Sequence, residues 1–364
     1  MTILDQLFSE YGQSPWLDNL RREWLHSGEL QSWIDKGVRG LTSNPSIFEK
    51  AISDSEAYDD QFQSLIQSGS TIEDAYWSLV QTDIADALVL MEPIYDSSNG
   101  LDGYVSVEVD PRLARDTKAT IDAARFLDEQ LKSKNLYIKI PGTKEGLPAI
   151  QEMISEGRSI NVTLLFSLER YSEVIESYIS GLEARDGDLS NISSVASFFI
   201  SRTETEVDSR LEAIGTSDAL DLKGKTAVSQ GQLAYKIFLE QFNTDRWKAL
   251  ENRGARVQRP LWASTSTKNP TYPDTLYVDQ LIGPDTVNTL PDGTLAAFLD
   301  HGNLARTIDA SFETATGILQ RVEALGVDLN DVAEKLEREG VSSFEASFEN
   351  LLITLSKKAE SLQA

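Results

Sequence analysis

The sequence contains no cysteine and only two histidines, His26 and His301, among its 364 residues. Without cysteine, the chain has no disulfide, no thiolate nucleophile and no cysteine-ligated zinc or iron–sulfur site. The two histidines lie far apart in the sequence, which excludes a multi-histidine metal site, and a Ser–His–Asp triad would need one of them. These absences remove thiol chemistry and the commonest metal sites.

Basic residues are also scarce, because 33 Lys and Arg stand against 58 Asp and Glu, for a formal net charge of −25. Nucleic acids and anionic membranes are bound through clustered cations, so this balance argues against both partners. No apolar run approaches the roughly 18 residues that span a bilayer. Residues 1–13 carry Asp5 and Glu10 without a basic cluster, unlike a secretory signal. We therefore expect a cytoplasmic enzyme or binding protein.

Low-complexity tracts, fixed-period repeats and Gly/Ser/Pro-rich linkers are missing as well. Hydrophobic residues make up 40% of the chain and charged residues 25%, which is typical of globular proteins with a sizeable core. We therefore expect a single domain over residues 1–364.

Short β-branched runs alternate with helical patterns along the chain. The clearest predicted strands are 103–110, 136–142, 159–167 and 195–201, and the helix-like stretches that follow them are 111–132, 144–156, 168–184 and 202–214. Weaker strands are predicted at 15–19, 37–43, 259–264 and 275–282. Residues 223–252 are expected to form two helices. The tail, 303–363, is expected to be helical with breaks near Gly326 and Gly340, either closing the bottom of the sheet structure or lying over the mouth of a site.

Eight strands separated by helices favour a (β/α)8 barrel over an open doubly wound sheet. The GxGxxG fingerprint follows none of the strands, and the GxxxxGK[ST] phosphate loop is missing. The predicted fold class is therefore an α/β TIM barrel with additional helices, including the C-terminal tail.

The clearest strands alternate apolar and polar residues instead of forming continuous apolar runs. Valines alternate with serine and acids in VSVEVD (105–110), and isoleucines flank Lys139 in IKI (138–140). An antiparallel sheet with one solvated face gives the same pattern. The intervening helices argue against that alternative, because they must pack outside the sheet and cover the apolar set. The polar set then points into the barrel, near the strand ends where barrel enzymes keep their chemistry.

Lys139 is the sharpest catalytic candidate. A lysine amine is a nucleophile only when neutral, and burial favours the neutral form that attacks a carbonyl to give a Schiff base. The alternative is a structural lysine paired with Glu108 from the neighbouring strand. Glu108 and Asp110 suit acid–base catalysis and Thr163 suits water positioning, although each also fits as a hydrogen-bonded interior residue.

Polar residues at other strand ends have two interpretations each. Asn44 in TSNPS is either a substrate ligand or the cap of the following helix. Arg202 begins a helix and Lys268 follows STST (264–267), so both suit a substrate phosphate, or are ordinary surface charges. Asp18 ends a weak strand and alone indicates little.

At these residues the chain resembles the transaldolase family. The resemblance rests on GLTSNPSIF, VSVEVDPRLARDT, LYIKIPGTKEGLPAI, INVTLLFSLERY and ASFFISR, in this order, with anchors from about Asp18 to Lys268. The length and the segment WASTSTKNP are similar to the longer cyanobacterial and actinobacterial members. The resemblance implies a (β/α)8 barrel without metal or organic cofactor, which moves a dihydroxyacetone unit between sugar phosphates in the pentose phosphate pathway.

The resemblance also implies the catalytic roles. Lys139 would form the Schiff base with the C2 carbonyl of a ketose phosphate, and Asp18 would take the C4 hydroxyl proton as the C3–C4 bond breaks. Glu108, with Thr163, would hold the water that shuttles protons.

The remaining roles concern substrate binding. By resemblance, Asn44, Asn161 and Ser197 would hydrogen-bond the dihydroxyacetone hydroxyls. Phe199 would line the pocket and Arg202 would bind the phosphate. Many members have a second phosphate-binding arginine, which Ser266 or Lys268 must replace here.

The implied partners are small sugar phosphates, and we expect either a monomer or a homodimer. Two alternatives remain: a Schiff-base aldolase that releases free dihydroxyacetone, and a non-catalytic barrel that binds sugar phosphates.

Overall fold

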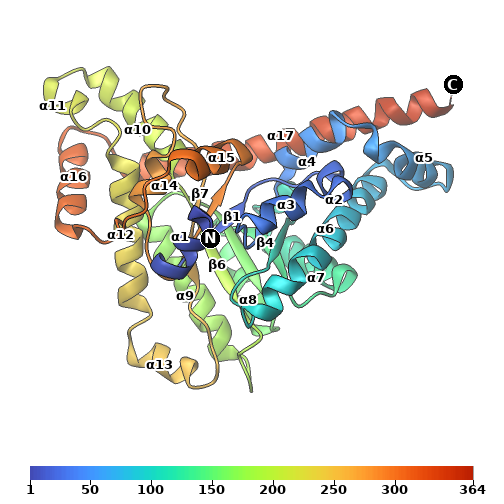
Figure 1. The fold of residues 1–364 in the computed structure, drawn as a ribbon, viewed down its shortest axis with the longest axis horizontal. Coiled ribbons are helices and arrows are strands. Elements are labelled where there is room, and N and C mark those ends of the chain that lie inside the picture. The colour runs from blue at the N-terminus through green and yellow to red at the C-terminus, as the bar shows by residue number, and fades with distance from the viewer. Residues whose placement is uncertain (364) are drawn as a thin grey trace.

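A computed structural model describes residues 1–363 of the chain, and its centre is a closed barrel of eight parallel strands (Figure 1). The strands are β1 (Gln13–Leu17), β2 (Leu41–Thr42), β3 (Val105–Glu108), β4 (Leu136–Pro141), β5 (Ile160–Leu165), β6 (Ser194–Phe199), β7 (Arg259–Ala263) and β8 (Thr286–Leu290). Each strand pairs with its neighbour in sequence, and β8 closes the barrel on β1, with Gln13 opposite Thr286. The predicted (β/α)8 fold is confirmed.

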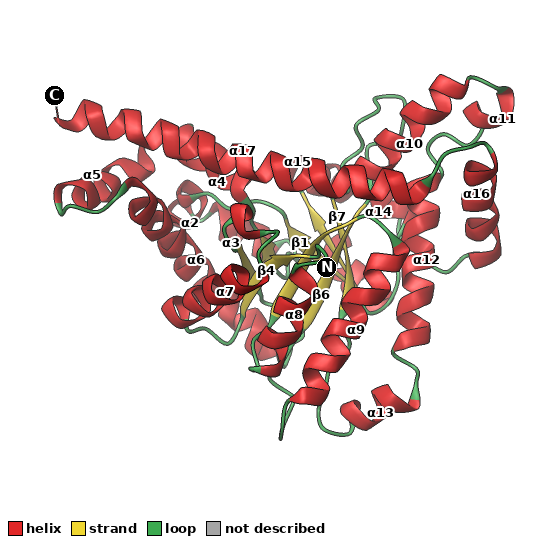
Figure 2. Cartoon of the chain, turned by 180° about the vertical axis from the view of Figure 1, so that it is seen from behind, coloured by secondary structure: helices red, strands yellow, loops and turns green. Residues whose placement is uncertain are grey.

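Helices surround the strands (Figure 2). Those before β3 are α1 (Ile3–Tyr11), α2 (Arg22–Ser27), α3 (Glu29–Asp35), α4 (Pro45–Ser53), the 3-10 turn η1 (Glu56–Tyr58), α5 (Asp59–Gln67) and α6 (Ile72–Ser97). Between β3 and β7 come η2 (Pro111–Leu113), α7 (Thr117–Leu131), α8 (Gly146–Ser155), α9 (Leu168–Ala184), α10 (Ser201–Ile214), α11 (Ser217–Leu220), α12 (Thr226–Gln241) and α13 (Asp245–Glu251). The last are α14 (Leu276–Gln280), α15 (Asp292–His301), α16 (Phe312–Ala324) and α17 (Leu329–Gln363).

The predicted alternation of strand side chains is confirmed. Val107, Ile138 and Val162 belong to the large apolar cluster that the strands share with the surrounding helices. Tyr137 and Leu261 belong to a second, inner cluster. Because side chains of a strand alternate between its two faces, the apolar set packs outward and the polar set between those positions points inward.

The predicted eighth strand is wrong. Residues 276–280 form the helix α14, and the true strand, β8, lies at Thr286–Leu290. Within the predicted strand 275–282, the residues Tyr277 and Val278 are buried from a short helix instead. The sequence of β8, TVNTL, carries little strand signal because two residues of its outward face are polar: Thr286 bonds to Gln13 on β1, and Asn288 accepts a hydrogen bond from Thr265.

The C-terminal tail lies over the mouth of the barrel. Helix α17 contacts α4, α10, η2 and β5, and Figures 1 and 2 show it as one long rod crossing the molecule. The predicted break near Gly326 is confirmed, because α16 ends at Ala324 and Gly326 has φ +93°. The predicted break at Gly340 is wrong. There, an added Cβ would lie 3.0 Å from Leu164 and 3.5 Å from Arg202, so this glycine permits close approach.

Among residues 1–363, no helix combines the length and apolar character needed to cross a membrane.

Candidate active site

A cavity of about 140 Å³ opens at the carboxyl end of the barrel strands. Its walls are Asp18, Thr42, Asn44, Lys139, Thr163, Ser197, Phe199, Arg202, Ala263, Ser264, Ser266, Lys268, Thr289, Pro291 and Phe344. Every residue to which the transaldolase resemblance assigns a role lines it except Glu108 and Asn161, which contact the lining residues Lys139 and Ser197. The structure therefore brings the predicted set together in one place.

Lys139 lies at the floor of this cavity, because the strand register places it between two polar neighbours. It is opposite Glu108 on β3 and opposite Asn161 on β5. Its Nζ atom is 3.3 Å from Oε2 of Glu108 and donates a hydrogen bond to the carbonyl oxygen of Ser43 at 3.1 Å. The lysine side chain is only 5% exposed. The amine is thus shielded from bulk water and beside an acid.

Glu108 is a buried carboxyl group with unused hydrogen-bonding capacity. Neither of its oxygens accepts a well-aligned hydrogen bond from any residue that the structure describes, although Nζ of Lys139 lies close. Burial raises the pKa of Glu108, and the positive charge of Lys139 only partly opposes this. The hydroxyl of Thr163 is also buried without a partner among the described residues. Beside it, β5 is irregular, and Leu164 has φ +60°.

Asp18 follows the end of β1 and faces the same cavity. Thr42 donates a hydrogen bond from Oγ1 to Oδ1 of Asp18 at 2.6 Å, and Thr289 lies 2.6 Å from that hydroxyl. Burial raises the pKa of Asp18, against the opposing effects of the Lys139 charge, the Thr42 hydrogen bond and the Arg202 charge. A carboxyl with a raised pKa accepts and returns protons more readily near neutral pH.

Amides and hydroxyls form one wall of the cavity. Ser197 donates from Oγ to Oδ1 of Asn161 at 2.7 Å, and Asn161 donates from Nδ2 to Oγ of Ser106 at 3.0 Å. Asn44 accepts the backbone N–H of Ile47 at 3.0 Å as the cap of α4. Asn44 therefore caps a helix and lines the cavity at once, so its two interpretations are compatible.

Cationic side chains form another wall. Arg202 lies in the first turn of α10 and makes no ion pair or hydrogen bond with the side chains that the structure describes. Burial lowers its pKa, and the charges of Asp18 and Glu108 partly oppose this effect. Nζ of Lys268 donates to Oγ of Ser266 at 2.6 Å. Partial burial and the nearby charge of Arg202 lower the pKa of Lys268. Ser266 and Lys268 thus lie in the cavity as a hydrogen-bonded pair.

Several known proteins are similar to this chain over nearly its whole length. The sequence model described as transaldolase/fructose-6-phosphate aldolase matches residues 15–355. The chain belongs to this transaldolase family. It is 49% identical over 352 residues to the transaldolase of Thermobifida fusca, which covers 95% of this chain and 96% of that protein. It is 48% identical over 357 residues to "Transaldolase 2" of Streptomyces avermitilis, which covers 97% and 96%. The resemblance inferred from the motifs is confirmed, including to actinobacterial members.

One acid–base candidate of this transaldolase-family chain does not line the cavity. Asp110 accepts Nε of Arg112 at 3.0 Å and Nη2 at 2.5 Å, and it caps the turn η2. Asp110 is therefore a hydrogen-bonded residue that caps a turn, as in the second of its two interpretations. His301 is exposed and bonds Asp274 and Asp300, outside the cavity.

Three residues that line the cavity, Thr42, Thr289 and Phe344, were not predicted from the sequence motifs. Thr42 and Thr289 lie at strand ends and bond to each other beside Asp18. Thr42 precedes Asn44 by two residues in TSNPS, which was a usable signal. Phe344 comes from α17, and its contribution had no local signal, because only the tertiary placement of this helix brings it to the cavity.

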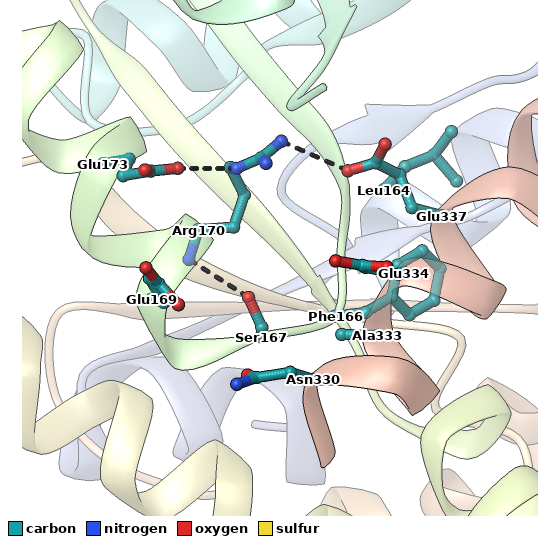
Figure 3. A pocket seen from close by; sticks show the side chains of 10 residues that line it. All are labelled: Leu164, Phe166, Ser167, Glu169, Arg170, Glu173, Asn330, Ala333, Glu334 and Glu337. Atoms are coloured by element: carbon teal, nitrogen blue, oxygen red, sulfur yellow. Dashed lines mark hydrogen bonds and ion pairs between the residues drawn. The ribbon is translucent and has the colours of Figure 1, made fainter. Parts of the chain in front are cut away.

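A larger cavity, of about 240 Å³, lies outside the barrel between the first turns of α9 and α17 (Figure 3). Figure 3 shows Arg170 reaching toward Glu173 on its own helix, at 2.7 Å, and toward Glu337 on α17, at 3.2 Å. Glu169 and Glu334 add further negative charge. This lining disfavours a phosphate, and it holds none of the residues that the transaldolase resemblance implies.

Proposed function

We propose that the protein is a transaldolase that transfers a dihydroxyacetone unit through a Schiff base on Lys139. The donor would be a ketose phosphate, sedoheptulose 7-phosphate or fructose 6-phosphate. The acceptor would be an aldose phosphate, glyceraldehyde 3-phosphate or erythrose 4-phosphate, as in the pentose phosphate pathway. The observation that carries this proposal is the shielded amine of Lys139, 3.3 Å from Glu108, on the floor of a cavity that Asp18 also lines.

The first stage is formation of the imine. The neutral amine of Lys139 adds to the C2 carbonyl carbon, and the carbonyl oxygen takes up a proton to give a carbinolamine. Loss of this oxygen as water leaves a protonated imine. Glu108 is placed to move these protons, since its carboxyl is in contact with the amine and has a raised pKa. Thr163, with its unpartnered hydroxyl, is placed to hold the water.

The second stage is cleavage of the carbon–carbon bond. Asp18 takes the C4 hydroxyl proton, C4 becomes an aldehyde carbon, and the C3–C4 electron pair moves onto C3, conjugated with the protonated imine. The first aldose phosphate leaves, the enamine attacks the carbonyl carbon of the second aldehyde, and Asp18 returns the proton to the new C4 hydroxyl group. Water then adds to C2 of the product imine, in the reverse of the first stage, and the C–N bond breaks to release the ketose phosphate and the free amine of Lys139. The imine itself accepts the electrons, so this sequence of steps requires neither a metal nor an organic cofactor.

The other cavity residues would bind the substrate. Arg202 and the Ser266–Lys268 pair offer positive charge and hydrogen-bond donors to a phosphate. Asn44, Asn161 and Ser197 offer amides and hydroxyls to the sugar hydroxyls, and Phe199 supplies an apolar wall. Lys268 would supply the positive charge, and Ser266 would orient the lysine side chain. Together these two residues would replace the second phosphate-binding arginine of many family members.

Transfer is favoured over release of free dihydroxyacetone by two observations. The relatives quoted above are named transaldolases, and α17 covers the barrel mouth. A covered site protects the enamine from protonation by water before the acceptor arrives.

Trapping with borohydride tests the proposal. Reduction of the protein with fructose 6-phosphate should add one reduced dihydroxyacetone unit, detected by intact mass and mapped to the peptide containing Lys139. Lys139→Arg, which retains a long cationic side chain, should fold and give no adduct. Absence of an adduct in the unmodified protein, or an adduct on another lysine, would overturn the proposal.

A second measurement separates the two activities named in the family description. With fructose 6-phosphate and erythrose 4-phosphate, a transaldolase forms sedoheptulose 7-phosphate at a rate that depends on the acceptor. Acceptor-independent release of dihydroxyacetone as the main reaction would identify an aldolase instead.

A further inference from the structure

We infer that Phe344, on the C-terminal helix α17, is a positioning residue that holds the guanidinium of Arg202 ready for the substrate phosphate. This inference rests on the proposed function, in which Arg202 binds that phosphate. It assigns to the tail a direct part in substrate recognition.

The guanidinium of Arg202 lies between two aromatic rings. Its central carbon is 5.3 Å from the ring centre of Phe199, at the end of β6, and 5.8 Å from that of Phe344. Both distances lie within the range of attractive cation–π contacts. Both rings line the cavity, and one belongs to the barrel strand β6 while the other belongs to α17.

Aromatic rings position this cation without using its hydrogen bonds. A guanidinium has five N–H donors, and for Arg202 none of them bonds to a residue that the structure describes. Carboxylates fix arginines elsewhere in this protein, as Asp83 fixes Arg22 at 2.7 Å, but such a partner also neutralises the charge and occupies the donors. Two aromatic rings leave the positive charge and the N–H donors of Arg202 free for a phosphate.

The ring of Phe344 is held in place because α17 is tethered on both sides of it. Before Phe344, Glu337 forms an ion pair with Arg170 at 3.2 Å (Figure 3). It also forms one with Arg115 at 2.7 Å. After it, the hydroxyl of Ser347 lies 2.7 Å from that of Ser46 on α4. These contacts fix the helix against the barrel, so Phe344 keeps its distance from Arg202.

Gly340 lies one helical turn before Phe344, on the same face. A Cβ atom at this position would be 3.5 Å from Nη1 of Arg202 and 3.0 Å from Cδ2 of Leu164. The missing side chain therefore lets the backbone of α17 come close enough for Phe344 to reach the guanidinium.

A pair of matched variants tests the inference. Phe344→Leu removes the ring beside Arg202 and keeps an apolar side chain. Phe348→Leu is the control, because Phe348 is the next turn of the same helix, is equally buried, and packs on Arg112 and Tyr76 outside the cavity. Both variants lose an aromatic contact, so a purely structural role predicts the same behaviour for both.

The first readout is binding of inorganic phosphate, measured by titration calorimetry, which does not depend on catalysis. We expect Phe344→Leu to weaken phosphate binding about 3- to 20-fold, as loss of one cation–π contact predicts. The KM for fructose 6-phosphate should rise by a similar factor while kcat stays within about twofold. Phe348→Leu should leave the phosphate affinity and the KM within about twofold of those of the unmodified protein. Phe344→Tyr, which keeps an aromatic ring, should do the same.

Equal shifts in both leucine variants, or no shift in phosphate affinity for Phe344→Leu, would overturn the inference. If Phe344→Leu does not fold, Phe344→Met takes its place, because methionine fills the same gap without a ring. Failure of the proposed function is seen separately, as absence of the borohydride adduct in the unmodified protein. The phosphate titration still decides the role of Phe344 in that case.

Discussion

The two ends of the barrel each bury a carboxylate, and the surroundings of the two groups differ. At the amino end, Asp102 accepts hydrogen bonds from Ser14 at 2.8 Å, Trp16 at 3.1 Å, Arg39 at 2.8 Å and Arg259 at 3.1 Å. At the carboxyl end, Glu108 meets one cation, Lys139 at 3.3 Å, and accepts no well-aligned hydrogen bond from the described residues. Both side chains are almost fully buried.

The pKa values follow from these partners. Burial alone would raise the pKa of Asp102, but the charges of Arg259 and Arg39 outweigh burial and lower it. Burial raises the pKa of Glu108 because the single lysine does not outweigh it. A saturated cluster with two arginines stabilises a permanent anion, while an unsaturated one leaves an acid able to exchange protons. We therefore expect the amino-end carboxylate to serve stability, and the proposed function assigns the chemistry to the carboxyl end.

The largest expected effect is at the amine of the carboxyl end. Lys139→Arg should lower kcat/KM for transfer from fructose 6-phosphate by about a thousandfold or more, because a guanidinium does not form the imine. Coupled assays with erythrose 4-phosphate measure this, and circular dichroism verifies the fold. Residual transfer within tenfold of the unmodified protein would mean that the carboxyl end is not the reactive one.

At the amino end, Asp102→Asn should cost about 3–5 kcal/mol of unfolding free energy, because it leaves Arg39 and the buried Arg259 without a counter-charge. Urea titration measures this loss. The kcat of the folded fraction should stay within about twofold. A large fall in kcat at unchanged stability would reverse the division between the two ends.

Glu108→Gln is the counterpart at the carboxyl end. It should lower kcat about 100-fold or more, as removal of a general acid–base group does. The loss of unfolding free energy, measured by urea titration, should be smaller than for Asp102→Asn. Glu108 accepts no well-aligned hydrogen bond from the described residues, and burial already disfavours its charged form. Equal stability losses in the two variants would contradict the comparison.

The smallest effect concerns Glu204 on α10, a buried acid that has no cation within hydrogen-bond distance in the described chain. It accepts the backbone N–H groups of Thr226 and Ala227 at 3.2 Å, yet burial, with the charge of Asp208, raises its pKa to about 8. Between its ordinary pKa of 4.5 and about 8, the folded chain keeps a proton that the unfolded chain has lost, so stability falls as the pH rises.

Glu204→Gln should remove this dependence. Between pH 5 and pH 8, the unfolding free energy of the unmodified protein should fall by at least about 1 kcal/mol relative to that of the variant. Urea titrations at several pH values provide the test. Parallel pH profiles for the two proteins would show that Glu204 is ionised in the folded state.

Sequence patterns were informative where the inward and outward faces of a strand differ. The alternation around Lys139 correctly predicted an inward-facing lysine beside Glu108, because strand period and parallel register determine that contact. The alternation is uninformative for β8, where Thr286 and Asn288 interrupt the outward apolar face and bond to Gln13 and Thr265. The nearby segment 276–280, predicted as a strand, is the helix α14. Local sequence patterns also do not predict the contacts of Gly340 and Phe344, because these contacts depend on where α17 packs.

The placement of α17 has a consequence for how the protein is made. Lys139 lies in the first half of the chain, whereas Phe344, the aromatic neighbour of Arg202 from the tail, belongs to the last described helix. During synthesis, all eight strands emerge before that helix, so the barrel can close while its mouth is still uncovered. In the proposed function, the phosphate site would therefore be complete only after α17 has docked over the cavity.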